Sequence, residues 1–183
     1  RLRAEGDAKA EALDPRVLLD LVALGPVADL VPLTNENRIL VAAGLRELSA
    51  LRRPGLAALA EMAGLTSGSL GTSEVSFRLA PRLNAAGRLG DAQVALDLLL
   101  ATDRERGADA ARDLEELNRE RQHIQESVWC EAVAAAEPYR DAPALVLGAE
   151  GWHQGVVGIV AAKLVDKYRR PVVVVGFSAG QGR

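Results

Sequence analysis

The sequence is poor in several residue types, and each shortage excludes a class of protein. One cysteine, Cys130, in 183 residues excludes a disulfide framework and a cysteine-rich zinc site. Two histidines, His123 and His153, leave little material for a histidine-based metal centre. Aromatic residues make up only 3% of the chain, which argues against single-strand binding through rows of stacked rings. Without a long apolar run or a signal-peptide pattern, we expect a soluble, cytoplasmic, globular protein.

The charge balance excludes a uniformly basic surface. Lysine and arginine total 22 against 25 aspartates and glutamates, a net charge of −3. Any contact with nucleic acid must therefore come from a local basic cluster. Only three of the basic residues are lysines, which is typical of a GC-rich genome, although selection for phosphate-binding guanidinium groups would give the same bias.

The first hundred residues carry helical patterns. Residues 1–13 are charged, non-periodic and typical of a loop. Helix starts and stops then punctuate the chain: a start at Asp14-Pro15 with a stop at Gly25-Pro26, starts at Thr34–Asn35 and Pro54-Gly55, and a short helix from Thr72 to Pro81. Residues 81–92 have the period of neither a helix nor a strand, and Asp91 is a cap for the helix that follows.

One long helix is predicted over residues 103–137, followed by a change of period. Five apolar residues and one arginine lie near a 3-4 seam, with charges elsewhere: Leu114, Leu117, Arg121, Ile124, Val128 and Ala135. The runs 144–148 and 171–177 are predicted to form buried strands, with a helix over 159–168 between them. Strand, helix and strand in this order predict a parallel βαβ unit, so the fold class is α/β.

Asp29 is the first candidate for chemistry. Its neighbours Val27, Ala28, Leu30, Val31 and Leu33 are apolar, and a carboxylate buried among them would be costly without a partner. A helix cap, a salt bridge or a bound hard cation would each offset that cost. One aspartate cannot form a metal site alone.

Residues 78–88 hold the second candidate, a local basic cluster. Arg78, Arg82 and Arg88 lie within eleven residues together with Asn84, and small residues follow Asn84. Guanidinium groups suit phosphate oxygens, and an amide suits a base edge or a sugar. A tight turn whose arginines pair with helix carboxylates is the alternative.

A glycine-rich helix start after the first strand is the third candidate. Gly151, Gly155 and Gly158 surround it, and free N–H groups at such a position can bind an anion. The pattern matches neither a Walker loop nor a dinucleotide fingerprint, so close packing of helix and strand is an equal alternative. His153, beside Trp152, is a further candidate ligand or an exposed ring.

Three stretches of the chain closely resemble one known family. DLVALGPVADLVPLTNENRILVAAGL, FRLAPRLNAAGRLGDAQVAL and EGWHQGVVGIVAAKLVDKYRRPVVVV are similar, in the same order, to the bacterial RecJ family of single-strand-specific exonucleases. RecJ proteins are DHH phosphoesterases with a DHH domain, a long connecting helix and a DHH-associated domain. The resemblance implies a two-metal centre with Mn²⁺ or Mg²⁺ and degradation of single-stranded DNA from the 5′ end to mononucleotides. It also implies roles in DNA repair and recombination, with a helicase and a single-strand-binding protein as partners.

The resemblance also implies roles for particular residues. Asp29 matches the family's late metal-binding aspartate, and Arg82, Asn84 and Arg88, with Arg78 upstream, become candidates for DNA or 5′-phosphate contacts. His153, Gly155 and Gly158 match the start of the associated domain. The implied division is the C-terminal part of a DHH domain over 1–102, a connector helix over 103–137 and the start of the associated domain over 138–183.

Departures from the family pattern limit these expectations. Pro26 stands where the family commonly has threonine, and the early DxD motif and the His-His pair are absent from these 183 residues. We therefore expect a segment of a longer enzyme that is inactive alone. The alternatives are a DHH phosphoesterase acting on short oligonucleotides or cyclic dinucleotides, and a non-catalytic helical interaction module.

Overall fold

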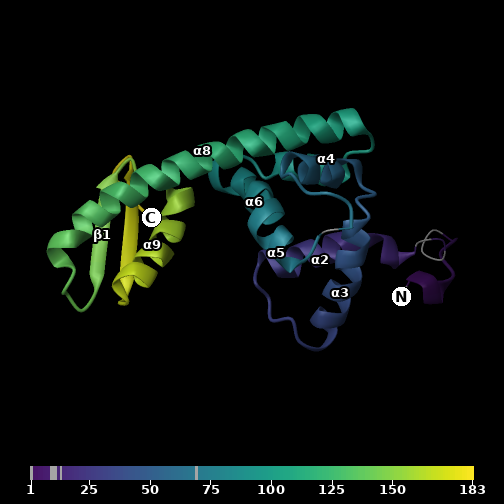
Figure 1. The fold of residues 1–183 in the computed structure, drawn as a ribbon, viewed down its shortest axis with the longest axis horizontal. Coiled ribbons are helices and arrows are strands. Elements are labelled where there is room, and N and C mark those ends of the chain that lie inside the picture. The colour runs from purple at the N-terminus through teal and green to yellow at the C-terminus, as the bar shows by residue number, and fades with distance from the viewer. Residues whose placement is uncertain (1, 9–11, 13, 69) are drawn as a thin grey trace. The chain divides into compact units, whose positions relative to one another are not determined.

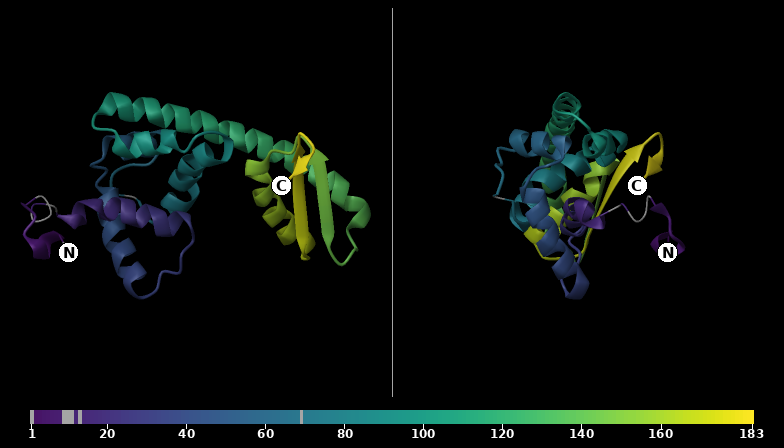
Figure 2. Two further views of the ribbon diagram at one scale, coloured as in Figure 1. Left: turned by 180° about the vertical axis from the view of Figure 1, so that it is seen from behind. Right: turned by 90° about the vertical axis from the view of Figure 1, so that its right-hand side faces the viewer.

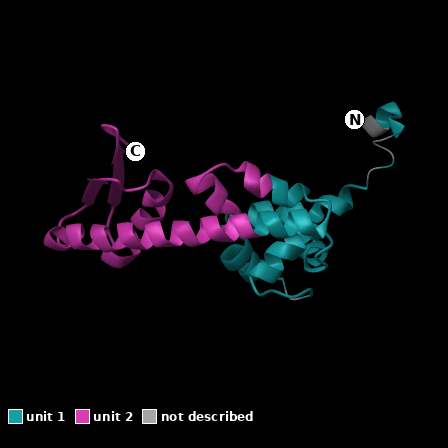
Figure 3. Cartoon of the chain, turned by 90° about the horizontal axis from the view of Figure 1, so that it is seen from above, with its two compact units in different colours: residues 1–81, 97–111 teal, residues 82–96, 112–183 magenta. Residues whose placement is uncertain are grey.

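The protein has an α/β fold that is mostly helical, with one small sheet near the C-terminal end (Figure 1). The computed structural model describes residues 2–8, 12, 14–68 and 70–183. The chain forms two compact units: residues 1–81 with 97–111, and residues 82–96 with 112–183 (Figure 3). The predicted three-part division into a DHH part, a connector and an associated domain stays a prediction.

The first unit is built from short helices. Their bounds are η1 Leu2–Glu5, η2 Pro15–Leu18, α2 Leu19–Ala28, α3 Asn35–Ser49, α4 Pro54–Met62, α5 Thr72–Glu74 and the π-helical segment η3 Val75–Leu79. The loop predicted over 1–13 lies partly outside the described residues, and its residues 2–5 form η1. The starts predicted at Thr34–Asn35 and Pro54-Gly55 are confirmed, since Thr34 precedes α3 and Pro54 opens α4.

The stop predicted at Gly25-Pro26 is wrong, because α2 continues through Pro26 to Ala28. Proline lacks only its own N–H, and near the end of a helix this loss removes a single hydrogen bond. Helix α2 packs on α3 at Gly44, where a Cβ atom would collide with the carbonyl oxygen of Leu19. Asp20, at the start of α2, is buried and pairs with Arg53, with 2.6 Å between its Oδ2 and Arg53 Nε.

The helix predicted to stop at Pro81 also runs on, and the irregular segment predicted over 81–92 is wrong for most of its length. α5 and η3 lead directly into α6, which spans Ala80–Leu89. The wide π-turn lies immediately before Pro81, where the Ala80 N–H donates to the Val75 carbonyl. A π-turn shifts the hydrogen-bond pattern by one residue, which accommodates a proline that cannot donate. Gly71 is the N-cap of α5, and its N–H donates to Glu74 Oε2 at 2.9 Å; backbone hydrogen bonds to this carboxylate lower the pKa of Glu74.

Helices α7, Gln93–Leu100, and α8, Arg104–Ala136, follow as predicted. Asp91 caps α7 by accepting from the Gln93 N–H at 2.9 Å. Leu114 and Val128 are buried as predicted, but the rest of the seam of α8 differs from the prediction. Its buried residues are apolar at both ends and polar in the middle: Ala111, Leu114, Asn118, Gln125, Val128, Ala132 and Ala136. Leu117 and Ile124 are only partly buried, and Ala135 is exposed.

The second unit contains the predicted βαβ arrangement. β1, Leu145–Glu150, pairs in parallel with β2, Val172–Ser178, and α9, Gln154–Tyr168, connects them (Figure 2). The register joins Leu145 to Val172 and Glu150 to Phe177, and a two-residue strand β3, Gln181–Gly182, pairs antiparallel with β2. A short 3-10 segment η4, Glu137–Tyr139, links α8 to this sheet.

One apolar cluster holds this unit together. Residues of α8, β1 and α9, together with Trp152 between β1 and α9, meet in it and are almost fully buried: Val128, Ala132, Ala136, Leu145, Leu147, Trp152, Val156, Val157, Val160 and Leu164. Trp152 is also fixed by a hydrogen bond from its Nε1 to Glu131 Oε2 at 2.9 Å. The cluster packs α9 and α8 against the sheet. In the described part of the chain, no helix combines the length and apolar character that crossing a membrane requires.

Candidate nucleic-acid interface

Asp29 lies immediately after helix α2, and its side chain is exposed to solvent. It is the C-cap of α2, and Leu30 after it takes a left-handed conformation with φ of 54°. The Val31 N–H bonds to the Pro26 carbonyl at 2.9 Å and the Leu30 N–H to Val27 at 3.4 Å, which is the pattern of a Schellman helix end. This turn fixes the backbone of Asp29 and leaves its side chain exposed.

The expectation that Asp29 is buried among apolar neighbours is therefore wrong for the structure of this chain. Val27 packs inward, but Leu30 is 82% exposed, and the left-handed turn directs the chain away from the core. The cost of burying the Asp29 carboxylate is therefore no longer a reason to expect a bound metal. An exposed carboxylate on a rigid helix end is still free to join other ligands.

The described residues do not make a metal centre by themselves. Among them, no three side chains of histidine, cysteine, aspartate or glutamate gather closely enough to hold an ion. Asp29 is one oxygen ligand of the kind that Mg²⁺ and Mn²⁺ take, and a two-metal site needs several. The described residues can therefore supply one ligand to a two-metal site but not the complete set of ligands.

Arg78 and Arg82 are both engaged by the protein. Arg78, exposed at the end of η3 in the first unit, donates through Nη2 to the Ala63 carbonyl. Arg82, on α6 in the second unit, donates from Nε to Glu115 Oε2 at 2.6 Å, and only 17% and 12% of these side chains are exposed. Arg119 reaches the other oxygen of Glu115 at 3.0 Å. The alternative of arginines that pair with helix carboxylates thus describes Arg82.

Asn84 and Arg88 lie on the exposed side of α6, while Ala85 and Ala86 between them are completely buried. Arg88 donates from Nη1 to the carbonyl of Gly155 at 3.0 Å, and this neutral acceptor leaves its charge unbalanced. A solvent-exposed guanidinium with spare donors is suited to a phosphate.

The first turn of α9 meets the end of α6 backbone to backbone. A Cβ atom on Gly155 would collide with the Arg88 carbonyl oxygen, so glycine is required there for close packing. His153 is exposed and caps α9, because its Nδ1 accepts from the Gly155 N–H at 3.0 Å. This N–H is therefore occupied. Gly158 is exposed with open space where a side chain would be.

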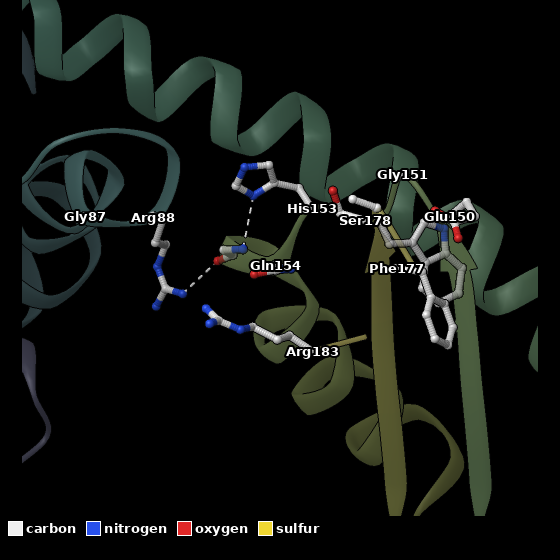
Figure 4. A pocket seen from close by; sticks show the side chains of 12 residues that line it. Gly87, Arg88, Glu150, Gly151, His153, Gln154, Phe177, Ser178 and Arg183 are labelled. Carbon is white, nitrogen blue, oxygen red and sulfur yellow. Dashed lines mark hydrogen bonds between the residues drawn. The ribbon is translucent and has the colours of Figure 1, made fainter. Parts of the chain in front are cut away.

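A pocket of about 860 Å³ in the second unit brings three of the predicted residues together: Arg88, His153 and Gly155 (Figure 4). It is open and is completed by Gln154, Ser178 and Arg183, with Glu150 as its acidic lining residue. Asn84 and Gly158 belong to the same unit but do not line the pocket, and Asp29 and Arg78 belong to the other unit. Sequence reasoning missed Gln154, although its place beside His153 in the same motif was a usable signal.

No family model matches the chain. It is 42% identical over 169 residues to the single-stranded-DNA-specific exonuclease RecJ of Bacillus subtilis, which covers 92% of this chain and 22% of that protein. The crystal structure of RecJ with Mg²⁺ from Thermus thermophilus aligns with a TM-score of 0.83 and 40% identity, over 92% of this chain and 27% of that one. A structure of exonuclease RecJ bound to manganese aligns with a TM-score of 0.79 at 40% identity, over 88% of this chain and 41% of that one.

The chain thus spans well under half the length of each of these proteins. Sequence and fold agree over about nine tenths of the chain, so the similarity extends across both compact units. The chain is homologous to one segment of the RecJ single-stranded-DNA-specific exonucleases.

Proposed function

We propose that the full-length protein is a metal-dependent exonuclease that degrades single-stranded DNA from the 5′ end to mononucleotides. One observation carries this proposal: RecJ exonucleases match about nine tenths of the chain at about 40% identity, with the same fold. Roles in DNA repair and recombination, a cytoplasmic location, and partnership with a helicase and a single-strand-binding protein are part of the same proposal.

Asp29 is proposed as one ligand of Mn²⁺ or Mg²⁺, the metals named for the two RecJ structures. Its exposed carboxylate at a rigid helix end supports this role, and the remaining ligands must come from outside the described residues. Such metals supply an activated water and offset the charge on the cleaved phosphate.

Arg88 is proposed as a contact for the DNA backbone, with Asn84, His153, Gly155 and Gly158 on the same unit as further candidates. Arg88 is supported by its exposure, by its neutral hydrogen-bond acceptor and by the absence of aspartate and glutamate from α6. Arg78 and Arg82 stay candidates with weaker support, because each already donates to a protein oxygen. We also propose that residues 1–102, 103–137 and 138–183 correspond to the DHH part, connector and associated domain.

A direct test uses the full-length protein with single-stranded oligonucleotides labelled at either end. We expect Mn²⁺-dependent release of a labelled mononucleotide first from the 5′-labelled strand, and no release in EDTA. Efficient cleavage of dinucleotides or cyclic dinucleotides with little action on long strands would instead favour the short-substrate phosphoesterase. Failure to bind single-stranded DNA at low salt would favour the interaction module. The 183-residue chain alone should be inactive, since it supplies only Asp29 to the proposed metal site.

A further inference from the structure

The middle of α8 carries a partly buried arginine, Arg121, that has no acidic partner among the described residues. Arg121 donates from Nη1 to Gln125 Oε1 at 2.8 Å and from Nη2 to Asn118 Oδ1 at 2.7 Å. Both acceptors are neutral amides, 9% and 2% exposed respectively. In the described part of the chain, no carboxylate forms an ion pair with Arg121.

The hydrogen bonds of this group are also incomplete. Arg121 Nε is buried and has no hydrogen-bond partner. Since a guanidinium carries five N–H donors, two bonds to amide oxygens leave donors unused. A charged group with unused donors in a partly buried position costs free energy. Its presence here therefore suggests that Arg121 has a hydrogen-bond acceptor from another molecule.

Arg88 lies close enough to Arg121 for their two positive charges to repel each other. Burial lowers the pKa of Arg121, and the positive charge of Arg88 lowers it further. Arg88 itself donates to a neutral carbonyl, that of Gly155. Both arginines belong to the second unit, one from α6 and one from α8. Each of these two arginines donates to neutral oxygens only, so together they form a local positive field that an anion would stabilise.

The seam of α8 argues that this polar segment is not ordinary packing. Apolar residues are buried on either side of it, Leu114 before and Val128 after. An apolar residue in place of Arg121 would continue the seam without an unsatisfied donor. Arg82 provides the contrast, because its guanidinium, also on the second unit, is matched by Glu115.

We propose that Arg121 and Arg88 together bind one backbone phosphate of single-stranded DNA, with Asn118 and Gln125 holding the Arg121 guanidinium in place. The proposal rests on the proposed function and adds a second arginine, from the connecting helix, to its DNA contacts. A phosphate oxygen can accept from guanidinium N–H groups, and the Nη atoms of the partly exposed Arg121 keep N–H donors that Asn118 and Gln125 do not use.

The test measures the salt dependence of binding in the full-length protein. Fluorescence anisotropy with a labelled oligo(dT) in EDTA gives the slope of log K against log[salt] for wild type and Arg121→Gln. Each lost phosphate contact flattens the slope for a single strand by about 0.7. We expect that loss and weaker binding in Arg121→Gln. Arg88→Gln should show a similar loss, and the double variant little more than either, because both contact one phosphate.

Arg119→Gln is the matched control, since it removes the same charge from the same helix at an exposed residue already paired with Glu115. Its slope should equal that of wild type. If Arg121→Gln does not fold, as judged by circular dichroism, Arg121→Lys takes its place and should weaken binding while keeping the slope. A wild-type slope and affinity in the folded variant overturn the inference and leave the proposed function intact. Absence of binding by the wild type overturns the proposed function itself.

Discussion

The two ends of helix α6 hold arginines in opposite environments. Near its start, Arg82 is mostly buried and bound to Glu115, while near its end Arg88 is exposed and bound only to a backbone carbonyl. One short motif, PRLNAAGR, therefore contains an arginine that stabilises the fold and another that is available to a ligand. Residue type alone does not separate these roles, because the separation comes from which arginine faces a buried carboxylate.

Replacing Arg82, at the buried start of α6, should have the largest effect on the free energy of unfolding. Arg82→Ala leaves the Glu115 carboxylate without its closer partner, and breaking a buried ion pair costs about 3–5 kcal/mol. Urea denaturation of the full-length protein, followed by circular dichroism, measures this change. Arg119→Ala removes the exposed partner of the same carboxylate and should cost at most about 1 kcal/mol. Equal costs for the two variants would mean that burial does not distinguish these arginines.

Leu114 is an uncharged residue that tests how much a buried side chain contributes to stability. It is completely buried on α8, so Leu114→Ala should cost about 2–5 kcal/mol by leaving a cavity. Leu117→Ala, on the partly exposed neighbouring position, should cost clearly less in the same urea experiment. An unchanged midpoint for Leu114→Ala would contradict the buried seam.

Asp29 extends the comparison to an exposed acid. Asp29→Asn keeps the shape of the side chain and removes its charge, so stability should change little. Turnover in the full-length protein should fall at least about a hundredfold, which corresponds to about 3 kcal/mol in the barrier. A rise in the manganese concentration needed for half-maximal activity would show that metal affinity has fallen too. Near-normal turnover at limiting manganese would leave Asp29 with only its place at the end of α2.

The exposed end of α6 should show the smallest effect on folding. Arg88→Ala removes a single exposed hydrogen bond, so the urea midpoint should stay near that of wild type. The salt slope for oligo(dT) binding should flatten by about 0.7, and affinity should fall equally for mixed sequences because phosphate contacts carry no base information. If Arg88→Ala keeps the wild-type salt slope and greatly lowers the urea midpoint, Arg88 stabilises the fold and does not contact DNA.

The long helix and the parallel βαβ unit could be predicted from sequence because their patterns are extended. The predicted helix over 103–137 differs from α8 by one residue at each end. Helix α6 could not be predicted in this way, since proline, asparagine and glycine lower its intrinsic propensity. Burial of Ala85 and Ala86 shows that tertiary packing offsets that weakness.

The candidate site was harder to predict than the fold. The apolar neighbours of Asp29 indicate burial. In the structure, however, Leu30 takes a left-handed conformation at the end of helix α2, and both Asp29 and Leu30 are exposed. The predicted seam of α8 is right at Leu114 and Val128 but wrong at Leu117 and Ile124 between them. The buried residues there are Asn118 and Gln125, and both accept hydrogen bonds from Arg121. A hydrophobic period cannot reveal a buried amide whose partner is a cation one turn away.

The contact between Gly155 and Arg88 has a mechanical consequence. Two peptide backbones touch there with no side chain between them, and the Arg88 guanidinium bonds back to the Gly155 carbonyl. Side chains can change rotamer to absorb a displacement, but touching main chains cannot. We therefore expect a shift of the first turn of α9 to displace the last turn of α6, and the Arg88 side chain with it.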